Sequence, residues 1–439
     1  MKNNKRLLVI LITLLQITSS KAQDTLHRVI GIQEILTMTE ENYRALKVSR
    51  LAVDLAGQRV EVAKLQRLPG ASATVMGGYL GNATILDPDF SNAKTIPMPH
   101  FSNTFALQAS QVIFKGNAIN NAIGITSLQE QLSVIGFQEN LMGAKLLVIG
   151  NYLDIFKLYN QRQVYEKNLS LALLRLKQIT VLYHQGMVTK NDVIRTELQI
   201  ANIRMAITIL NNNYNIINKQ LTTITGLNEN MVILPDTSIL ERKPVLNNYT
   251  VYRDQAQNNA PAIRAAQTGV TIAQHSVAMA KADRLPTLSA YAGNNLARPI
   301  TTALPPLDKY TNGWQAGLSL SFNIASIYTA PKTVRLNKIQ LKQAEENEKL
   351  TRDNRNIAVN AAFIKHQEAI SLSETLTENV RLAGENYRIT EKKYLNQLAL
   401  LIDVLDATNA KLDAELQLIN SKINILYTYY QLQKEVGTL

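Results

Sequence analysis

Cysteine is absent from the 439 residues, and the five histidines lie far apart in the sequence. Without cysteine the chain has no disulfide framework, no thiolate metal site and no acceptor for an N-terminal lipid. The histidines show no spacing typical of metal ligands, and no glycine-rich phosphate loop or nucleophile elbow occurs. We therefore predict no cofactor, no metal and no catalysis. The histidines are His27, His100, His184, His275 and His366.

Long hydrophobic runs are also scarce. A basic start precedes the apolar run Leu7–Ile17, and residues 20–22 have the small-x-small pattern that signal peptidase accepts. A run of about 11 residues is shorter than the roughly 20 that a membrane-spanning helix needs, which argues against an N-terminal anchor. We therefore predict a signal peptide over residues 1–22, followed by export.

After this segment, no stretch reads as apolar enough to cross a membrane as a helix. A membrane location would then require a closed β-barrel, because in lipid only helices and closed barrels satisfy every backbone polar group.

The formal net charge is +12. A basic chain suggests a nucleic-acid partner, but the lysines and arginines are scattered among Glu, Asp and Gln without a dense patch. We interpret them as solvated helix surface and predict no nucleic-acid partner.

The chain contains an internal repeat. Tyr183–Gly226 aligns without a gap with Tyr394–Gly437, and upstream the sequence at 67–69 (Arg-Leu-Pro) recurs at 284–286. A matched order of segments in both halves is hard to obtain by chance. We predict a first repeat over residues 23–226, an inter-repeat equatorial segment over 227–258, and a second repeat over 259–439.

Each repeat is predicted to run helix, strand, loop, strand, long helix, turn, helix. Pro69 and Pro286 end the first helices, because proline cannot continue the hydrogen-bond ladder. The strands are expected at about residues 71–81, 101–114, 287–296 and 312–323.

The last of these strands alternates most clearly. Apolar side chains at Trp314, Leu318, Leu320 and Phe322 oppose small polar ones, as a lipid-facing barrel strand requires. A soluble strand with one buried face has the same pattern. Four strands cannot close a barrel, since small barrels start at about eight, and three chains would supply about twelve.

The helix lengths agree within each repeat. Residues 117–183 would run roughly 100 Å as a helix, and residues 33–66 plus 190–225 would stack to roughly 105 Å. The second repeat gives roughly 93 Å against roughly 98 Å. A cylinder of helices fits these dimensions, and an ordinary bundle fits the apolar stripes equally well.

Three stretches resemble the TolC family of trimeric outer-membrane efflux channels, and the resemblance covers essentially the whole chain after the signal. They are residues 284–288 (RLPTL), 314–321 (WQAGLSLS) and 402–408 (IDVLDAT), with the terminal residues 436–439 (VGTL). Residues 183–193 also resemble the family's glycine-centred turn at the periplasmic tip.

The resemblance implies a mainly α fold with a membrane β-barrel, built from two helix–strand–strand–helix–helix repeats per chain. It implies a homotrimer whose 12-stranded β-barrel lies in outer-membrane lipid and whose long α-helical barrel crosses the periplasm. It also implies docking to a periplasmic adaptor (membrane fusion) protein, and through it to an inner-membrane transporter. Substrates would pass without chemistry.

By position, the resemblance assigns a periplasmic gate to Asp403, Asp406, Tyr394 and Asp192. The first two match the constricting aspartates, Tyr394 the gate tyrosine, and Asp192 its acceptor in the first repeat. Three copies of the two aspartates around a three-fold axis would favour cations and let one plug the pore. Solvated helix surface is the other interpretation.

The tip departs from the family pattern at two positions. Ala399 replaces the gate arginine, so one restraint on the closed state is missing. Gln397 replaces the turn glycine that matches Gly186, so we expect the second tip to turn differently. Gly186 and Gln397 mark the turns expected to dock the adaptor.

The resulting functional prediction is the exit duct of a tripartite efflux system. The outer-membrane channel of a type I protein secretion system would have the same fold. A secreted helical structural or adhesive protein would explain the export and the helices, but not the four strands.

Overall fold

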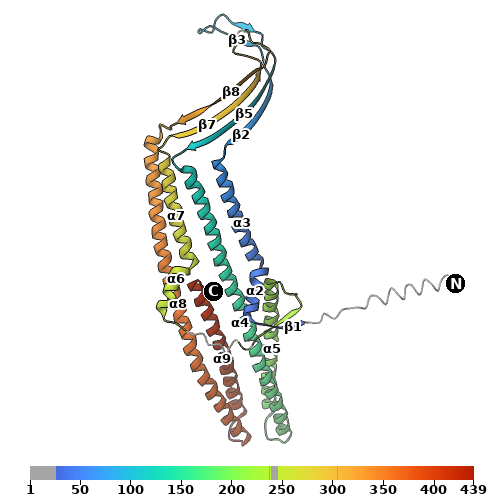
Figure 1. The fold of residues 1–439 in the computed structure, drawn as a ribbon. Helices are drawn as coiled ribbons and strands as arrows, with labels where there is room; N and C mark the ends of the chain where they lie inside the picture. The colour runs from blue at the N-terminus through green and yellow to red at the C-terminus, as the bar shows by residue number, and fades with distance from the viewer. Residues whose placement is uncertain (1–25, 237, 239–245, 304) are drawn as a thin grey trace, which may run out of the picture. The chain divides into compact units, whose positions relative to one another are not determined.

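The computed structural model describes residues 26–236, 238, 246–303 and 305–439. The predicted signal peptide lies outside these described residues. The described chain is mainly helical (Figure 1). Its helices are α2 (Ile32–Asn42), α3 (Arg44–Lys64), the short η1 (Leu65–Arg67), α4 (Ala118–His184), α5 (Lys190–Thr225), α6 (Tyr249–Asn259), α7 (Pro261–Ala282), α8 (Ser326–Leu395) and α9 (Leu401–Val436). Its strands are β1 (Leu26–Ile30), β2 (Gly70–Tyr79), β3 (Ala83–Ile85), β4 (Lys94–Ile96), β5 (Phe101–Phe114), β6 (Met231–Pro235), β7 (Thr287–Arg298) and β8 (Thr311–Ser321).

Two compact units make up the chain, and each draws on both halves of the sequence. The sheet unit consists of Leu51–Gly136 and Ala262–Thr351, and the helical unit of Met1–Arg50, Phe137–Pro261 and Arg352–Leu439. The compact units therefore differ from the predicted repeats, since each unit takes a part from both.

The sheet unit contains a four-stranded antiparallel sheet in the order β2-β5-β7-β8. Gly70 pairs with Ser110, and Thr287 pairs with Ser321. β2 and β7 begin where their antiparallel partners β5 and β8 end. All four junctions between strands and helices therefore lie at the same end of the strands. The outer strands β2 and β8 each pair with a single strand of the chain.

Both faces of this sheet are uncovered. All ten residues of β2 are exposed, and the apolar row on β8 includes Trp314, Leu318 and Leu320 at 81, 67 and 70% exposure. The alternative interpretation of these strands, a soluble strand with one buried face, is therefore not supported, because no core covers the apolar face in the described chain. Apolar rows of this size are stable only when another apolar phase or another protein surface covers them.

The sharp entry into α4 requires glycine. Gly116 has φ +56°, and a Cβ at this position would lie 2.9 Å from the Cβ of Ala282 on α7. An added side chain would therefore meet both backbone strain and a steric clash.

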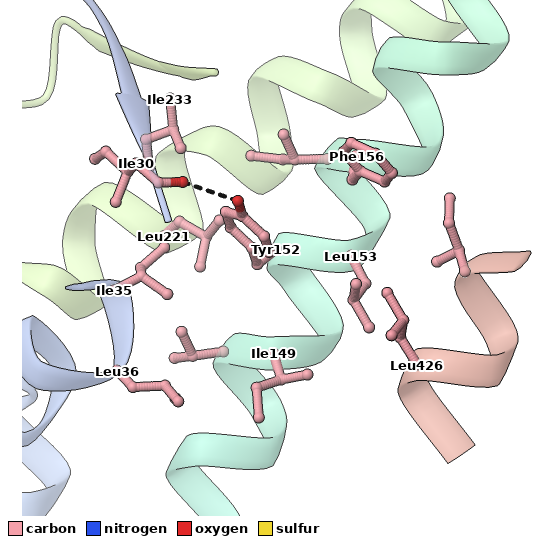
Figure 2. Packing of buried hydrophobic residues seen from close by; sticks show 13 residues of the cluster. Ile30, Ile35, Leu36, Ile149, Tyr152, Leu153, Phe156, Leu221, Ile233 and Leu426 are labelled. Carbon is pink, nitrogen blue, oxygen red and sulfur yellow. Dashed lines mark hydrogen bonds between the residues drawn. The ribbon is translucent and has the colours of Figure 1, made fainter. Parts of the chain in front are cut away.

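The core of the helical unit is centred on α4 (Figure 2). Tyr152 and Phe156 are fully buried and pack with side chains from α2, α5 and α9. The Tyr152 hydroxyl donates a hydrogen bond to the Ile30 carbonyl oxygen, at 2.8 Å, and accepts one from the Asp236 amide, at 2.9 Å. One buried hydroxyl therefore fixes the ends of β1 and β6.

The predicted inter-repeat segment 227–258 contains regular structure. Within it, β6 pairs in parallel with β1, and the Asn218 side chain on α5 bonds the Met231 carbonyl and the Ile233 amide at 2.7 and 2.9 Å. The segment ends in α6, whose Tyr252 is buried. Short strands and α6 have no strong hydrophobic periodicity, so residue patterns did not predict them.

The helices that precede β2 and β7 are broken in the same way. The sequence predicted a single helix over 33–66, which an extended residue interrupts at Tyr43 (φ −64°, ψ 119°). The helix predicted over 259–283 is α7, and the extended residue Ala260 (φ −61°, ψ 120°) separates it from α6, which was not predicted. Pro261 explains the second break, because a residue before proline avoids the helical region.

One helix contradicts the prediction that no stretch after the signal could cross a membrane. Among the described residues, α4 is long and apolar enough to do so by length and composition alone. Its apolar side chains include Ile149 and Phe156, which are fully buried in the helical unit, although only 28% of its most apolar window is buried within the chain.

Candidate functional site

The two helix–turn–helix tips of the helical unit have the same backbone. In the first, the Gly186 amide bonds the Tyr183 carbonyl at 2.9 Å and the Met187 amide bonds the Leu182 carbonyl at 2.9 Å. In the second tip, the matching pairs are Gln397 with Tyr394, at 2.9 Å, and Leu398 with Lys393, at 2.8 Å. These paired bonds are those of a Schellman turn.

Gln397 adopts the conformation for which glycine is normally used. Its φ is +59°, against +74° for Gly186. The expectation that the second tip turns differently is therefore wrong, because the hydrogen bonds of the turn outweigh the cost of a left-handed side-chain residue, about 1–2 kcal/mol.

Asp192 and Asp403 cap the helices that leave the two turns. Asp192 Oδ2 accepts hydrogen bonds from the Thr189 amide, at 2.9 Å, and the Thr189 hydroxyl, at 2.8 Å, while Thr189 Oγ1 accepts from the Asp192 amide at 3.3 Å. Asp403 Oδ2 accepts from the Leu400 amide at 2.9 Å. Leucine has no side-chain acceptor, so only half of the capping box exists in the second tip.

Asp403 and Asp406 are both exposed and lie three residues apart on α9. This spacing places their carboxylates on one side of the helix. The pair therefore presents two negative charges, one of which also caps α9.

Tyr394 lies in a small apolar cluster at the tip. It packs against buried Ile179, Leu401 and Leu405, and its hydroxyl is buried with no hydrogen-bond partner among the described residues. Burial raises the pKa of Tyr394, the charge of Asp192 raises it further, and Arg175 lowers it. The predicted pair is thus close enough for Asp192 to affect Tyr394 electrostatically, but no hydrogen bond joins them.

Arg175 is a tip residue that the sequence did not reveal. It lies on α4 and is only 8% exposed. Its Nη1 donates to Thr408 Oγ1 on α9 at 3.1 Å, and its Nη2 donates to the Tyr387 hydroxyl on α8 at 3.0 Å. Glu391 accepts a hydrogen bond from Tyr387 and lies 3.7 Å from Arg175 Nη2.

The Arg175 network connects the first helical hairpin to the second. Burial and the hydrogen bond to Glu391 raise the pKa of Tyr387 to about 12, so its hydroxyl stays protonated and donates to that carboxylate. A signal did exist in the sequence: Arg175 interrupts an apolar stripe that includes Ala172 and Ile179, and a cation in such a stripe needs a partner.

No group of three or more His, Asp or Glu side chains could hold a metal ion in the part of the chain that the structure describes. His184, at the end of α4, is exposed and lies beside the ring of Tyr183.

Residues 252–438 match the family model described as outer membrane efflux protein. This match, together with the fold, confirms the predicted resemblance. No curated protein sequence matches the chain.

Solved structures match the fold over nearly the whole chain. CusC, described for its folding and transmembrane channel formation, has a TM-score of 0.78 at 15% identity, with 92% of each chain covered. The outer membrane protein VceC of Vibrio cholerae has a TM-score of 0.75 at 12% identity, covering 92% of this chain and 96% of its own. The CmeC outer membrane channel of Campylobacter jejuni has a TM-score of 0.74 at 14% identity, covering 93% and 85%. The chain therefore has the mainly helical fold of outer-membrane channels.

Proposed function

We propose that this relative of the outer membrane efflux proteins is the exit duct of a tripartite efflux system in the outer membrane. The observation that carries the proposal is the four-stranded sheet, whose two faces are uncovered and one of which has an apolar row. At one end of its strands this sheet continues into very long helices. Its strands have 10 to 14 residues, enough for tilted strands that need about 9–11 residues to span a bilayer. The family match of residues 252–438 supports the same conclusion.

The assembly that we infer is a homotrimer. The outer strands β2 and β8 each have one unpaired edge in the chain, and an open edge in lipid would leave backbone groups unsatisfied. Pairing β8 of one copy with β2 of the next would give three sheets and a 12-stranded barrel. The long helices would then form a periplasmic α-helical barrel.

We also infer that the chain arose by duplication, with repeats over residues 23–226 and 259–439. Support comes from matched details: the breaks at Tyr43 and Ala260, the caps by Asp192 and Asp403, and the identical tip turns. Helices α5 and α9 also end alike, at residues 226 and 437, both glycines with φ of +73° and +84°.

For the gate, we propose that Asp403 and Asp406 from three copies form an anionic ring at the tip, with Tyr394 and Asp192 behind it. Such a ring attracts cations and can be blocked by one. The role of the arginine that Ala399 replaces would pass to Arg175, which already connects α4 to α8 and α9 within one chain.

The tip turns are the surface that we propose for the periplasmic adaptor, which in turn engages the inner-membrane transporter. Around Gly186 and Gln397, apolar side chains are unusually exposed: Met187 at 53%, Leu398 at 76% and Leu400 at 70%. Apolar side chains at helix tips suit packing against the helical hairpin of another protein.

The first test is insertion of the purified chain into planar bilayers, where we expect stepwise ion conductance from trimers. Extraction from outer membranes should require detergent. Release by salt alone, with no conductance, would instead favour a secreted helical protein.

Deletion of the gene then separates two transport roles. An efflux duct predicts increased sensitivity to toxic small molecules with normal protein secretion. Loss of a secreted protein with unchanged sensitivity would assign the channel to type I secretion.

A further inference from the structure

Exposed cations stand beside exposed apolar residues where the sheet meets the long helices. At three of these four junctions the two residues are neighbours in the chain, and the apolar side chains are 46 to 60% exposed. The pairs are Arg67 with Leu68, Lys115 with Phe114, and Arg284 with Leu285.

The fourth junction, between β8 and α8, has the longest series of cations. Exposed Phe322, Ile324 and Tyr328 (46, 73 and 70%) come first. Four exposed cations follow within the next turns of α8, and none of them forms an ion pair with another described residue. They are Lys332, Arg335, Lys338 and Lys342. Their spacing of three or four residues places them along one side of the helix.

Acidic residues are nearly absent from this region. Residues 309–344 contain neither Asp nor Glu, and Glu345 and Glu346 follow three and four residues after Lys342. At the other junctions, Glu61 is paired with Lys64 at 2.7 Å, and Asp283 is the acidic neighbour of Arg284. The positive charge of Lys332 and Arg335 is therefore not neutralised locally, whereas Arg284 and Lys342 have acidic neighbours.

Apolar side chains beside unpaired cations are typical of the boundary between hydrocarbon and water. The apolar groups enter the edge of the hydrocarbon, and long Lys and Arg side chains extend from it to reach the headgroups. Cations at an anionic lipid surface each add a favourable attraction that decays within a Debye length.

We propose that five of these cations, Arg67, Lys115, Arg284, Lys332 and Arg335, form a basic collar that binds anionic phospholipid headgroups. Lys338 and Lys342 are left out, because at 1.5 Å per residue they lie about 18 and 24 Å along α8 from its first residue, beyond the reach of the headgroups. The leaflet concerned is the one on the helix side of the sheet. This inference rests on the proposed function, since it needs the sheet in a membrane. Around a trimer the collar would be a continuous ring that fixes the depth of the barrel and selects the lipids around it. All five residues belong to the sheet unit.

The test uses the full mature chain, reconstituted in vesicles of zwitterionic phosphatidylcholine alone or mixed with anionic phosphatidylglycerol. Native mass spectrometry of the released trimers counts the retained lipids. We expect the wild type to retain phosphatidylglycerol preferentially, in a salt-sensitive way. The quadruple variant Lys115→Gln, Arg284→Gln, Lys332→Gln, Arg335→Gln should lower this preference by at least about tenfold.

A matched variant removes the same charge from exposed positions of the helical unit. It carries Lys167→Gln, Lys177→Gln, Arg204→Gln and Lys422→Gln, and it should keep the lipid preference of the wild type. Addition of inorganic phosphate distinguishes lipid headgroup binding from simple anion binding. If phosphate at low concentration displaced the retained phosphatidylglycerol, the cations would form a phosphate site without lipid selection, and the proposal would be overturned.

The remaining outcomes are also decisive. Conducting channels with equal lipid preference in the wild type and both variants would overturn the collar and leave the channel intact. Failure to insert or conduct in either vesicle would overturn the proposed function, and the collar with it.

Discussion

The guanidinium of Arg175 on α4 lies over the ring of Tyr387 on α8, 5.8 Å from its centroid, and donates to the hydroxyl oxygen of that tyrosine. Lys411 on α9 lies over the same ring at 4.8 Å. A single aromatic residue thus gathers cations from two other helices near the tip, and Glu391 supplies the neutralising charge.

Replacing Arg175 with Leu should loosen the tip. The change leaves Tyr387, Glu391 and Thr408 without their shared donor, and we expect a loss of about 1–3 kcal/mol of local stability. Faster hydrogen exchange of the α8 and α9 amides over residues 387–408 would measure this loss of local stability. We also expect the single-channel conductance to rise.

The control for this change is Arg381→Gln. Arg381 bonds Glu378 and Glu385, but its side chain is 59% exposed, so its loss should cost less than about 1 kcal/mol. Equal protection of α9 amides in the two variants would show that Arg175 does not hold the helices together.

Neutralising Asp403 and Asp406 together should relieve block by added multivalent cations and change the single-channel conductance. Asparagine is the better substitute at 403, because it keeps an acceptor for the Leu400 amide, whereas Asp403→Ala would also remove a helix cap worth about 1 kcal/mol. Planar-bilayer recordings give the measurement, with Asp413→Asn as the control. Unchanged conductance and cation block in the double variant would refute the gate assignment, even for a working channel.

The two tip turns should respond in opposite ways to glycine exchange. Gln397→Gly removes left-handed strain and should stabilise the second turn by about 1 kcal/mol. Gly186→Ala should destabilise the first by about as much, through backbone strain alone, since a Cβ at this position meets nothing within 4 Å. Exchange rates of the Met187 and Leu398 amides report each turn. Faster exchange at Leu398 in Gln397→Gly would contradict the strain argument.

His366 should make the stability depend on pH. It is fully buried between α8 and α9, where its Nδ1 lies 2.9 Å from Thr428 Oγ1. The hydroxyl donates to the Asn424 carbonyl, so Nδ1 carries the proton, and Nε2 has no partner among the described residues. Burial lowers the pKa of His366.

The sign follows from the neutral folded state. Below a pH of about 6.5 the unfolded chain binds a proton that the folded chain resists, so stability is full above that pH and falls as the pH drops through the folded pKa. Thermal unfolding in detergent at neutral and acidic pH should show this loss in the wild type and a smaller one in His366→Gln. The exposed His184→Gln should behave like the wild type, and an unaltered acid loss in His366→Gln would exclude His366 as its origin.

Local patterns in the sequence carried much of the fold. The two-residue alternation predicted strands at about 101–114 and 312–323, where β5 and β8 lie at Phe101–Phe114 and Thr311–Ser321. Pro69 and Pro286 marked where helices give way to strands. Such signals involve neighbouring residues only, so they can be recognised without knowledge of distant contacts.

Other features depended on partners distant in sequence. The pairing of β1 with β6, the break at Tyr43 and the missed helix α6 carry weak local signals. The burial of Arg175 against residues more than 200 positions away has the same long-range character.

The two helix–turn–helix tips show which features depend on local sequence and which depend on tertiary packing. The sequence by itself determined that two similar helix–turn–helix units exist and that Asp192 and Asp403 occupy matching positions after their turns. Only the tertiary structure decided that Gln397 turns as glycine does, that both aspartates cap helices, and that Arg175 connects the hairpins. The reason is physical: a turn or a cap is encoded by a few adjacent residues, whereas the partner of a buried charge is chosen by how separate helices pack.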